Sequence, residues 1–254
     1  MSAPVRFRVS SVVCLVALMV LLAVAAAACR SVFSRKYEYD EDVLLALDGS
    51  ATVYVNAAVP ALVALRGLDL DVNPRARLDL KKIRAAYESP VSHVANVSGS
   101  RRDNRRYVHL RIDVPDITKL ADAPPFAWSR YQLDRGDGLV TYRQTVHTAV
   151  AREVGNVGWG GAELVAFRLH LPSRVPFHNS PSREIERGNI IVWEQKLTDR
   201  LASVPIDIEV RMEAESILIR TLTLFAITVV LAALTFGLVI WWTLRKGKVR
   251  TGGS

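Results

Sequence analysis

Cysteine is nearly absent from this sequence of 254 residues. It occurs twice, as Cys14 and Cys29, so residues 30–254 contain none. A disulfide within that part of the chain is therefore excluded, and so is a metal site built on thiolates. The folded part must be stabilised by its hydrophobic core.

Recognisable catalytic motifs are absent as well. The five histidines form no ligand pattern such as H-E-x-x-H, and the sequence has no G-x-S-x-G motif, no Walker loop and no G-x-G-x-x-G after a strand. His109 and His170 alternate with apolar residues on predicted strands, which favours structural imidazoles. We therefore expect no metal and no cofactor, and a binding role is favoured over an enzymatic one.

Charge is absent from residues 221–240. At about 1.5 Å per residue this run is long enough to cross a hydrocarbon core of about 30 Å. Four residues typical of the membrane interface follow it: Trp241, Trp242, Arg245 and Lys246. The sequence predicts a transmembrane helix over residues 217–244 and a basic cytoplasmic tail over residues 245–254.

The N-terminal segment has the pattern of a secretory signal. Two arginines precede an apolar run that ends in small residues, so residues 1–28 are predicted to be a signal peptide. Ala26-Ala27-Ala28-Cys29 resembles a bacterial lipobox, which makes Cys29 a candidate for lipidation. Ordinary cleavage after Ala28 and an uncleaved anchor are the alternatives.

The basic charge of the chain lies in its flanks. The net charge is +8, but residues 30–216 hold 26 Lys and Arg against 25 acidic residues. A nucleic-acid partner is therefore not expected. The flanks instead indicate a single-pass protein of the bacterial cytoplasmic membrane, with residues 29–216 extracytoplasmic and the C-terminus in the cytoplasm.

Within residues 29–216 the apolar pattern mostly has a period of two. Residues 107–114 and 204–212 alternate strictly and predict strands with one buried face. Six less regular runs are also predicted strands: 36–47, 50–56, 126–133, 139–147, 163–171 and 189–197. Asp48-Gly49 predicts a type I′ hairpin, and residues 135–138 predict another.

Two helices are expected between the early strands. One begins at Asn73-Pro74 and ends at Ser89, and a shorter one covers residues 60–66 and closes at Gly67. The predicted fold class is α+β, with an antiparallel, partly barrel-like sheet of about seven to nine strands and about two helices, followed by the transmembrane helix.

Two segments are candidates for contact with lipid. Residues 155–161 contain four glycines and Trp159, which predicts a flexible loop that places an indole on headgroups or a ligand. Alternatively, Trp159 folds back and plugs one end of the sheet. Four arginines surround a predicted turn and suit an anionic headgroup, although such turns are commonly only solvated: Arg101, Arg102, Arg105 and Arg106.

The order of these features resembles the LppM-like domain family of bacterial envelope lipoproteins. The clearest likeness is an apolar strand around Trp193, with Met212 and Ala214 preceding the membrane helix. Ala26 at the lipobox position and the predicted helix over residues 73–89 depart from the family. The resemblance implies a partly barrel-like α+β domain that engages envelope lipids, with no catalytic residues to transfer.

These observations predict a membrane-tethered extracytoplasmic binding module. Its partner would be a membrane or envelope lipid, an apolar ligand or a membrane protein. Only residues 213–216 separate the last predicted strand from the apolar run, so the tether spans roughly 10 to 15 Å. The alternative is a hydrolase or transferase of envelope components whose acid and base form no recognisable motif.

Overall fold

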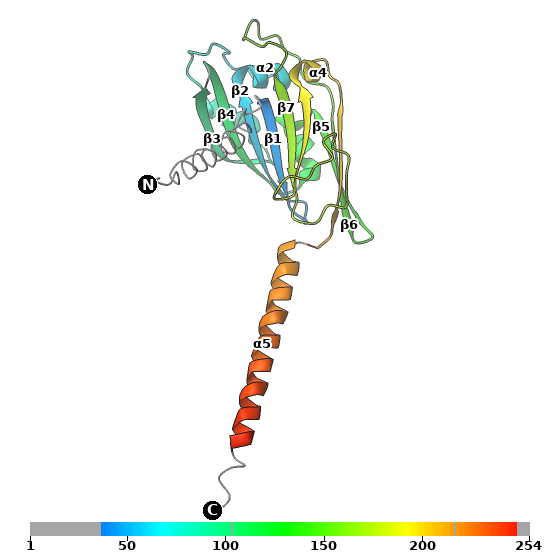
Figure 1. Cartoon of the computed structure of the whole chain (residues 1–254). Helices are drawn as coiled ribbons and strands as arrows, with labels where there is room; N and C mark the ends of the chain where they lie inside the picture. The colour runs from blue at the N-terminus through cyan, green and yellow to red at the C-terminus, as the bar shows by residue number, and fades with distance from the viewer. Residues whose placement is uncertain (1–36, 103, 216, 248–254) are drawn as a thin grey trace, which may run out of the picture. The chain divides into compact units, whose positions relative to one another are not determined.

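The computed structural model describes residues 37–102, 104–215 and 217–247, whose strands form two sheets (Figure 1). The predicted signal peptide and Cys29 lie outside these ranges. In the six-stranded sheet the strand order is β3-β4-β2-β1-β7-β9, and in the four-stranded sheet it is β5-β6-β10-β8. The strands are β1 (Tyr37–Leu45), β2 (Ala51–Ala58), β3 (His93–Arg102), β4 (Arg105–Val114), β5 (Ser129–Gly136), β6 (Leu139–Val146), β7 (Leu164–His170), β8 (Phe177–His178), β9 (Ile190–Lys196) and β10 (Ile206–Glu213).

Each of the eight predicted runs overlaps a strand, and the α+β class is confirmed. In β4 the predicted apolar face, from Val108 to Val114, is buried. The sequence missed β3 and β8. Most residues of β3 are exposed, so it lacks the alternation that marks a half-buried strand, and β8 has two residues.

The prediction of one antiparallel, partly barrel-like sheet is confirmed only in part, because the described strands form two sheets that are mostly antiparallel. β1 and β7 pair in parallel. After β6, the chain crosses from the four-stranded sheet to the six-stranded sheet. It enters β7 at the same end of that sheet where β1 begins, so β1 and β7 run in the same direction. Both sheets as described are open, because their terminal strands do not pair with one another.

Of the two predicted hairpins, one has the expected geometry. In the β5–β6 turn both Asp137 and Gly138 have positive φ, as a type I′ turn requires. In the β1–β2 turn only Gly49 does, and the Asp48 carboxylate accepts a hydrogen bond from the Ser50 backbone N–H at 2.9 Å. That local bond supports a longer loop, so the type I′ prediction there is wrong.

The helices partly follow the prediction. α2 (Val59–Arg66) ends at Gly67, whose φ is +70°. α3 (Leu80–Tyr87) is shorter than predicted, because Asp79 caps it by accepting from the Lys82 N–H, while Asn73 instead stabilises a turn with Arg75 N–H. Three short helices were not predicted: η2 (Ile117–Asp122), η3 (Pro124–Phe126) and α4 (Leu197–Leu201).

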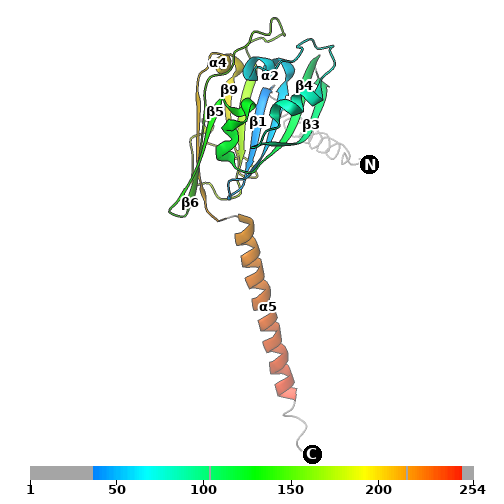
Figure 2. The same cartoon turned by 180° about the vertical axis from the view of Figure 1, so that it is seen from behind.

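The core lies between the two sheets, and α3 packs beside β3 on the inner face of the larger sheet (Figure 2). Three aromatic rings pack together at the centre of the core. The Trp128 ring centre lies 5.6 Å from that of Tyr39 and 5.7 Å from that of Phe167. A buried ion pair lies beside these rings, with Arg66 Nη2 2.8 Å from Glu41 Oε2. The core thus encloses this ion pair among its apolar side chains.

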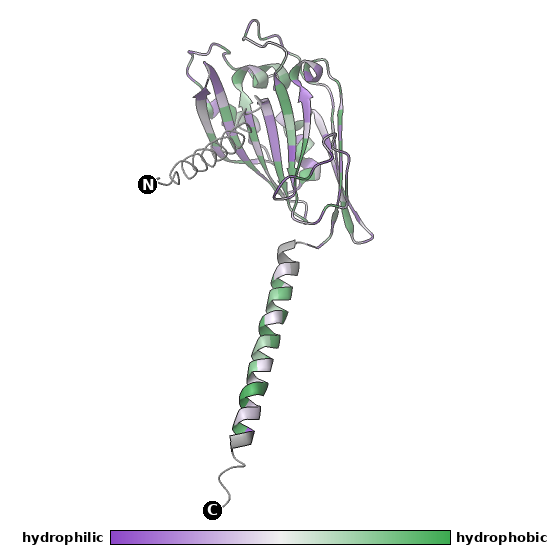
Figure 3. Ribbon diagram, viewed as in Figure 1, coloured by the Kyte–Doolittle hydropathy of each residue, from purple (hydrophilic) through white to green (hydrophobic). Residues whose placement is uncertain are grey.

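The final helix, α5 (Ile217–Gly247), contains the stretch predicted to span a membrane (Figure 3). Residues Thr221–Arg245 form the one helix in the described ranges that is long and apolar enough to do so. Trp241 and Trp242 are exposed, and the Arg245 guanidinium lies 4.7 Å from the Trp241 ring centre. Lys246 is also in α5.

Candidate functional site

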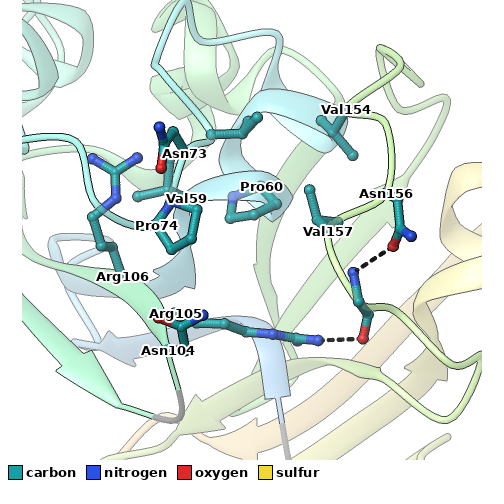
Figure 4. Close-up of a pocket in the computed structure, with 12 residues that line it drawn as sticks. Val59, Pro60, Asn73, Pro74, Asn104, Arg105, Arg106, Val154, Asn156 and Val157 are labelled. Atoms are coloured by element: carbon teal, nitrogen blue, oxygen red, sulfur yellow. Dashed lines mark hydrogen bonds between the residues drawn. The ribbon is translucent and has the colours of Figure 1, made fainter.

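A pocket of about 490 Å³ lies at one end of the sheets, where segments distant in sequence meet (Figure 4). Its walls come from the start of α2, the segment before α3, the β3–β4 turn and the glycine-rich loop. The lining residues are Val59, Pro60, Val72, Asn73, Pro74, Asn104, Arg105, Arg106, Val154, Asn156, Val157 and Gly158.

The pocket wall is amphiphilic. Four valines and two prolines supply apolar surface, while three asparagine amides and two guanidinium groups supply polar atoms. Among the described residues that line it, none carries a carboxylate. A ligand that suits such a wall is partly apolar and carries a neutral polar or negatively charged group.

Arg106 is fixed in the wall by backbone carbonyls. Its Nη1 donates to the carbonyl of Ala76 at 3.1 Å and its Nη2 donates to the carbonyl of Asp71. The residue is 5% exposed, and its Nε has no hydrogen-bond partner among the described residues. Burial lowers the pKa of Arg106, the Asp71 charge opposes this, and Arg101 adds to it.

Arg105 connects the β3–β4 turn to the glycine-rich loop. Its Nη1 donates to the Glu38 carboxylate, and its Nη2 donates to the carbonyl of Gly158 at 2.6 Å, as Figure 4 shows. The Glu163 carboxylate lies 3.9 Å from the same guanidinium. Arg105 therefore holds the loop against the strands.

Trp159 is half-buried rather than displayed on the tip of the loop. Its indole N–H donates to Glu38 at 3.1 Å, and its ring packs against the core. Glu163 orders the next residues by accepting from the N–H groups of Gly160 and Gly161, each at 2.8 Å. Burial alone would raise the pKa of Glu163, but these N–H groups, together with the Glu163 backbone N–H and the Arg105 charge, lower it.

The other two arginines of the predicted cluster lie outside the pocket lining. Arg101 donates to the carbonyl of Pro74 at 2.8 Å. The Arg102 guanidinium lies 5.3 Å from the Tyr107 ring centre. The structure therefore brings Arg105 and Arg106 together with the glycine-rich loop, and leaves Arg101 and Arg102 on the edge.

Sequence reasoning missed Glu38, which joins Arg105 and Trp159. Glu38 is an acidic residue on a predicted strand. The structure buries it fully, but burial is not visible in a single sequence. Sequence reasoning also missed that Val59 and Pro60 line the pocket, because apolar residues at the start of a helix are expected in the hydrophobic core. The described residues contain no group of three or more potential ligands that could hold a metal ion.

The pocket and the membrane helix lie at opposite ends of β10. The start of β10, Ile206, pairs with Val146, and the chain just after Val146 bonds to α2 through the Val150 N–H and the Leu65 carbonyl. The last residue of β10, Glu213, pairs with Leu139 and leads to α5. Eight strand residues span about 26 Å. With a tether of three residues, the pocket is at the end of the domain remote from the point of attachment.

Comparisons with known proteins add little. No protein-family model and no curated protein matches the chain. A solved structure, the NMR structure of the folded domain of Mycobacterium tuberculosis LppM, is similar with a TM-score of 0.40 and 14% identity, covering 72% of this chain and 93% of that one. The LppM resemblance in the sequence thus has a distant structural counterpart, which shows neither family membership nor function.

Proposed function

We propose that this protein is a membrane-tethered extracytoplasmic binding module, and that its pocket holds an amphiphilic ligand such as an envelope lipid. The observation that carries the proposal is the lining of the pocket. Its valines and prolines suit an acyl or other apolar chain, and Arg105 and Arg106 with the asparagine amides suit a polar or anionic headgroup.

The pocket has the size of known ligand sites. Its volume of about 490 Å³ falls within the range of roughly 300 to 1,000 Å³ that small-molecule pockets occupy. The membrane location is supported by α5, and the orientation proposed for it follows from the basic residues after the apolar run. The tether leaves the pocket facing away from its attachment point, which favours a ligand that has left the bilayer over one embedded beside α5.

The test is organic extraction of the full-length protein, purified in detergent, followed by mass spectrometry. We expect about one amphiphile per chain, and at least tenfold less in Val157→Trp, because the indole fills the pocket. Val204→Trp is the matched control, since Val204 is 46% exposed and lies outside the pocket.

Two results would count against the proposal. Wild-type protein without any bound amphiphile would shift the role toward a membrane-protein partner. Equal amounts in wild type and Val157→Trp would place the ligand somewhere other than this pocket.

A further inference from the structure

The outward face of the six-stranded sheet carries a continuous line of polar contacts. Hydrophilic residues alternate along these strands in Figure 3. Five of them, one from each neighbouring strand, form a chain: Arg168 on β7, Asp40 on β1, Asn56 on β2, His109 on β4 and Ser100 on β3. Direct cross-strand pairing aligns its middle, because Asp40 is opposite Asn56 and Asn56 is opposite His109.

The chemistry of Asp40 fixes the direction of each hydrogen bond. The Asp40 carboxylate, which also accepts from Arg168, can only accept, so the amide NH₂ of Asn56 donates to it. The Asn56 Oδ1 then faces His109 Nδ1 at 2.8 Å. Because that oxygen can only accept, Nδ1 carries the imidazole proton.

This arrangement leaves a lone pair on His109 Nε2. Ser100 Oγ lies 2.8 Å from that nitrogen, so the serine hydroxyl donates to the imidazole. A hydroxyl within 2.6 to 3.2 Å of a base that a third group orients is the signature of an activated nucleophile. The sequence predicted His109 to be a structural imidazole because it alternates with apolar residues on a strand. Its contacts with Asn56 and Ser100 depend on strand pairing and are visible only in the structure.

We propose that Ser100 is a nucleophile toward carboxylic esters, with His109 as its general base and Asn56 and Asp40 as positioning residues. Ser100 is exposed, so an ester carbonyl reaches Oγ without entering a cleft. This activity is independent of the pocket described above and gives the chain a hydrolytic function of its own.

The reaction balances with water as the only co-reactant. Ser100 Oγ attacks the ester carbonyl carbon while its proton passes to His109 Nε2. The carbon–oxygen bond to the alcohol breaks, the alcohol takes that proton, and an acyl group remains on Ser100. Water, deprotonated by His109, then attacks the acyl carbon and releases the carboxylic acid, and the proton returns to Ser100.

The test uses the full chain in detergent and a fluorophosphonate probe, which phosphonylates activated serines with loss of fluoride. We expect peptide mass spectrometry to find the label on Ser100, and Ser100→Ala to remove it. His109→Gln should slow labelling at least about 100-fold, the lower range of general-base effects. Ser98→Ala is the control, because Ser98 is exposed on the same strand directly opposite His109 and is expected to leave the rate unchanged.

A second measurement separates activation from a purely structural role. In ¹⁵N-histidine spectra of the wild-type chain, His109 should be in the Nδ1–H tautomer, and Asn56→Leu should lose both that tautomer and most of the labelling rate. Thermal unfolding of each variant reports whether the fold is kept. The proposal is overturned if wild type labels no faster than His109→Gln, or if folded Asn56→Leu labels at the wild-type rate.

Discussion

Glu41 and Arg66 show how single side chains shape the interior of this domain. Both are buried, and Glu41 also accepts from Tyr39 at 2.8 Å and faces Tyr131 and Gln144 at 3.4 and 3.5 Å. The Arg66 guanidinium lies 3.2 Å from the Trp128 ring centre. Burial raises the pKa of Tyr39 and Tyr131, so the phenols stay protonated and can donate to the carboxylate.

Removing one member of this pair should be costly. Arg66→Met leaves the Glu41 charge buried without its cation, which should lower the free energy of unfolding by about 3 to 5 kcal/mol. The double variant Arg66→Met with Glu41→Leu should recover most of that loss. Chemical denaturation of the fragment 30–216 measures both.

As a control, Arg143→Met breaks contacts in which the arginine side chain is 42% exposed and should cost about 1 kcal/mol or less. A loss in Arg66→Met no larger than in this control would contradict the assignment.

Among the elements, the glycine-rich loop decides access to the pocket. Its contacts favour the interpretation that Trp159 closes this end of the sheet, whereas lipid contact by Trp159 and the nearby arginines stays a prediction. Arg105 and Trp159 both donate to Glu38. Within the loop, Trp159 bonds directly to Glu38, and the Gly158 carbonyl accepts from Arg105. Opening the loop therefore breaks one bond to the Glu38 carboxylate and one to the Arg105 guanidinium.

Tryptophan fluorescence can separate the two roles of this loop. Hydrogen bonds to charged groups contribute about 1.5 to 3 kcal/mol, so Glu38→Gln should loosen the loop and move the Trp159 emission to longer wavelength. The measurement uses the fragment 30–216, which lacks Trp241 and Trp242. Trp159→Phe in the same background is the control, because Trp128 and Trp193 are buried. Anionic vesicles should leave the wild-type spectrum unchanged. A blue shift with vesicles that disappears in Trp159→Phe would instead support lipid contact.

For the whole molecule, membrane orientation is the property to test. If Arg245, Lys246 and the basic residues after them stay in the cytoplasm, alkaline phosphatase inserted at Gly138 should be active, because that hairpin tip is exposed and belongs to the exported domain. The same enzyme fused after Ser254 should be inactive, while a green fluorescent protein at that site should fluoresce. The opposite pattern would reverse the orientation of the domain.

Local patterns in the sequence were sufficient for much of this fold. The alternation in residues 107–114, the apolar run of α5 and the glycine that ends α2 were all predicted, because each depends on neighbours a few residues apart. The same applies to Asp137-Gly138, whose turn type follows from its two residues. Arg105, Arg106 and Trp159 were chosen as candidate residues from local clusters in the sequence.

Only the tertiary structure decided which of these parts meet. The parallel pairing of β1 with β7, the burial of Glu38 beside Arg105, and the alignment of Ser100, His109 and Asn56 all join residues that are distant in the chain or on different strands. A strand's periodicity fixes which face is buried but carries no information about its neighbour, so pairing is set by the combined packing of the two sheets. The pocket exists because that packing brings four separate segments to one end of the domain.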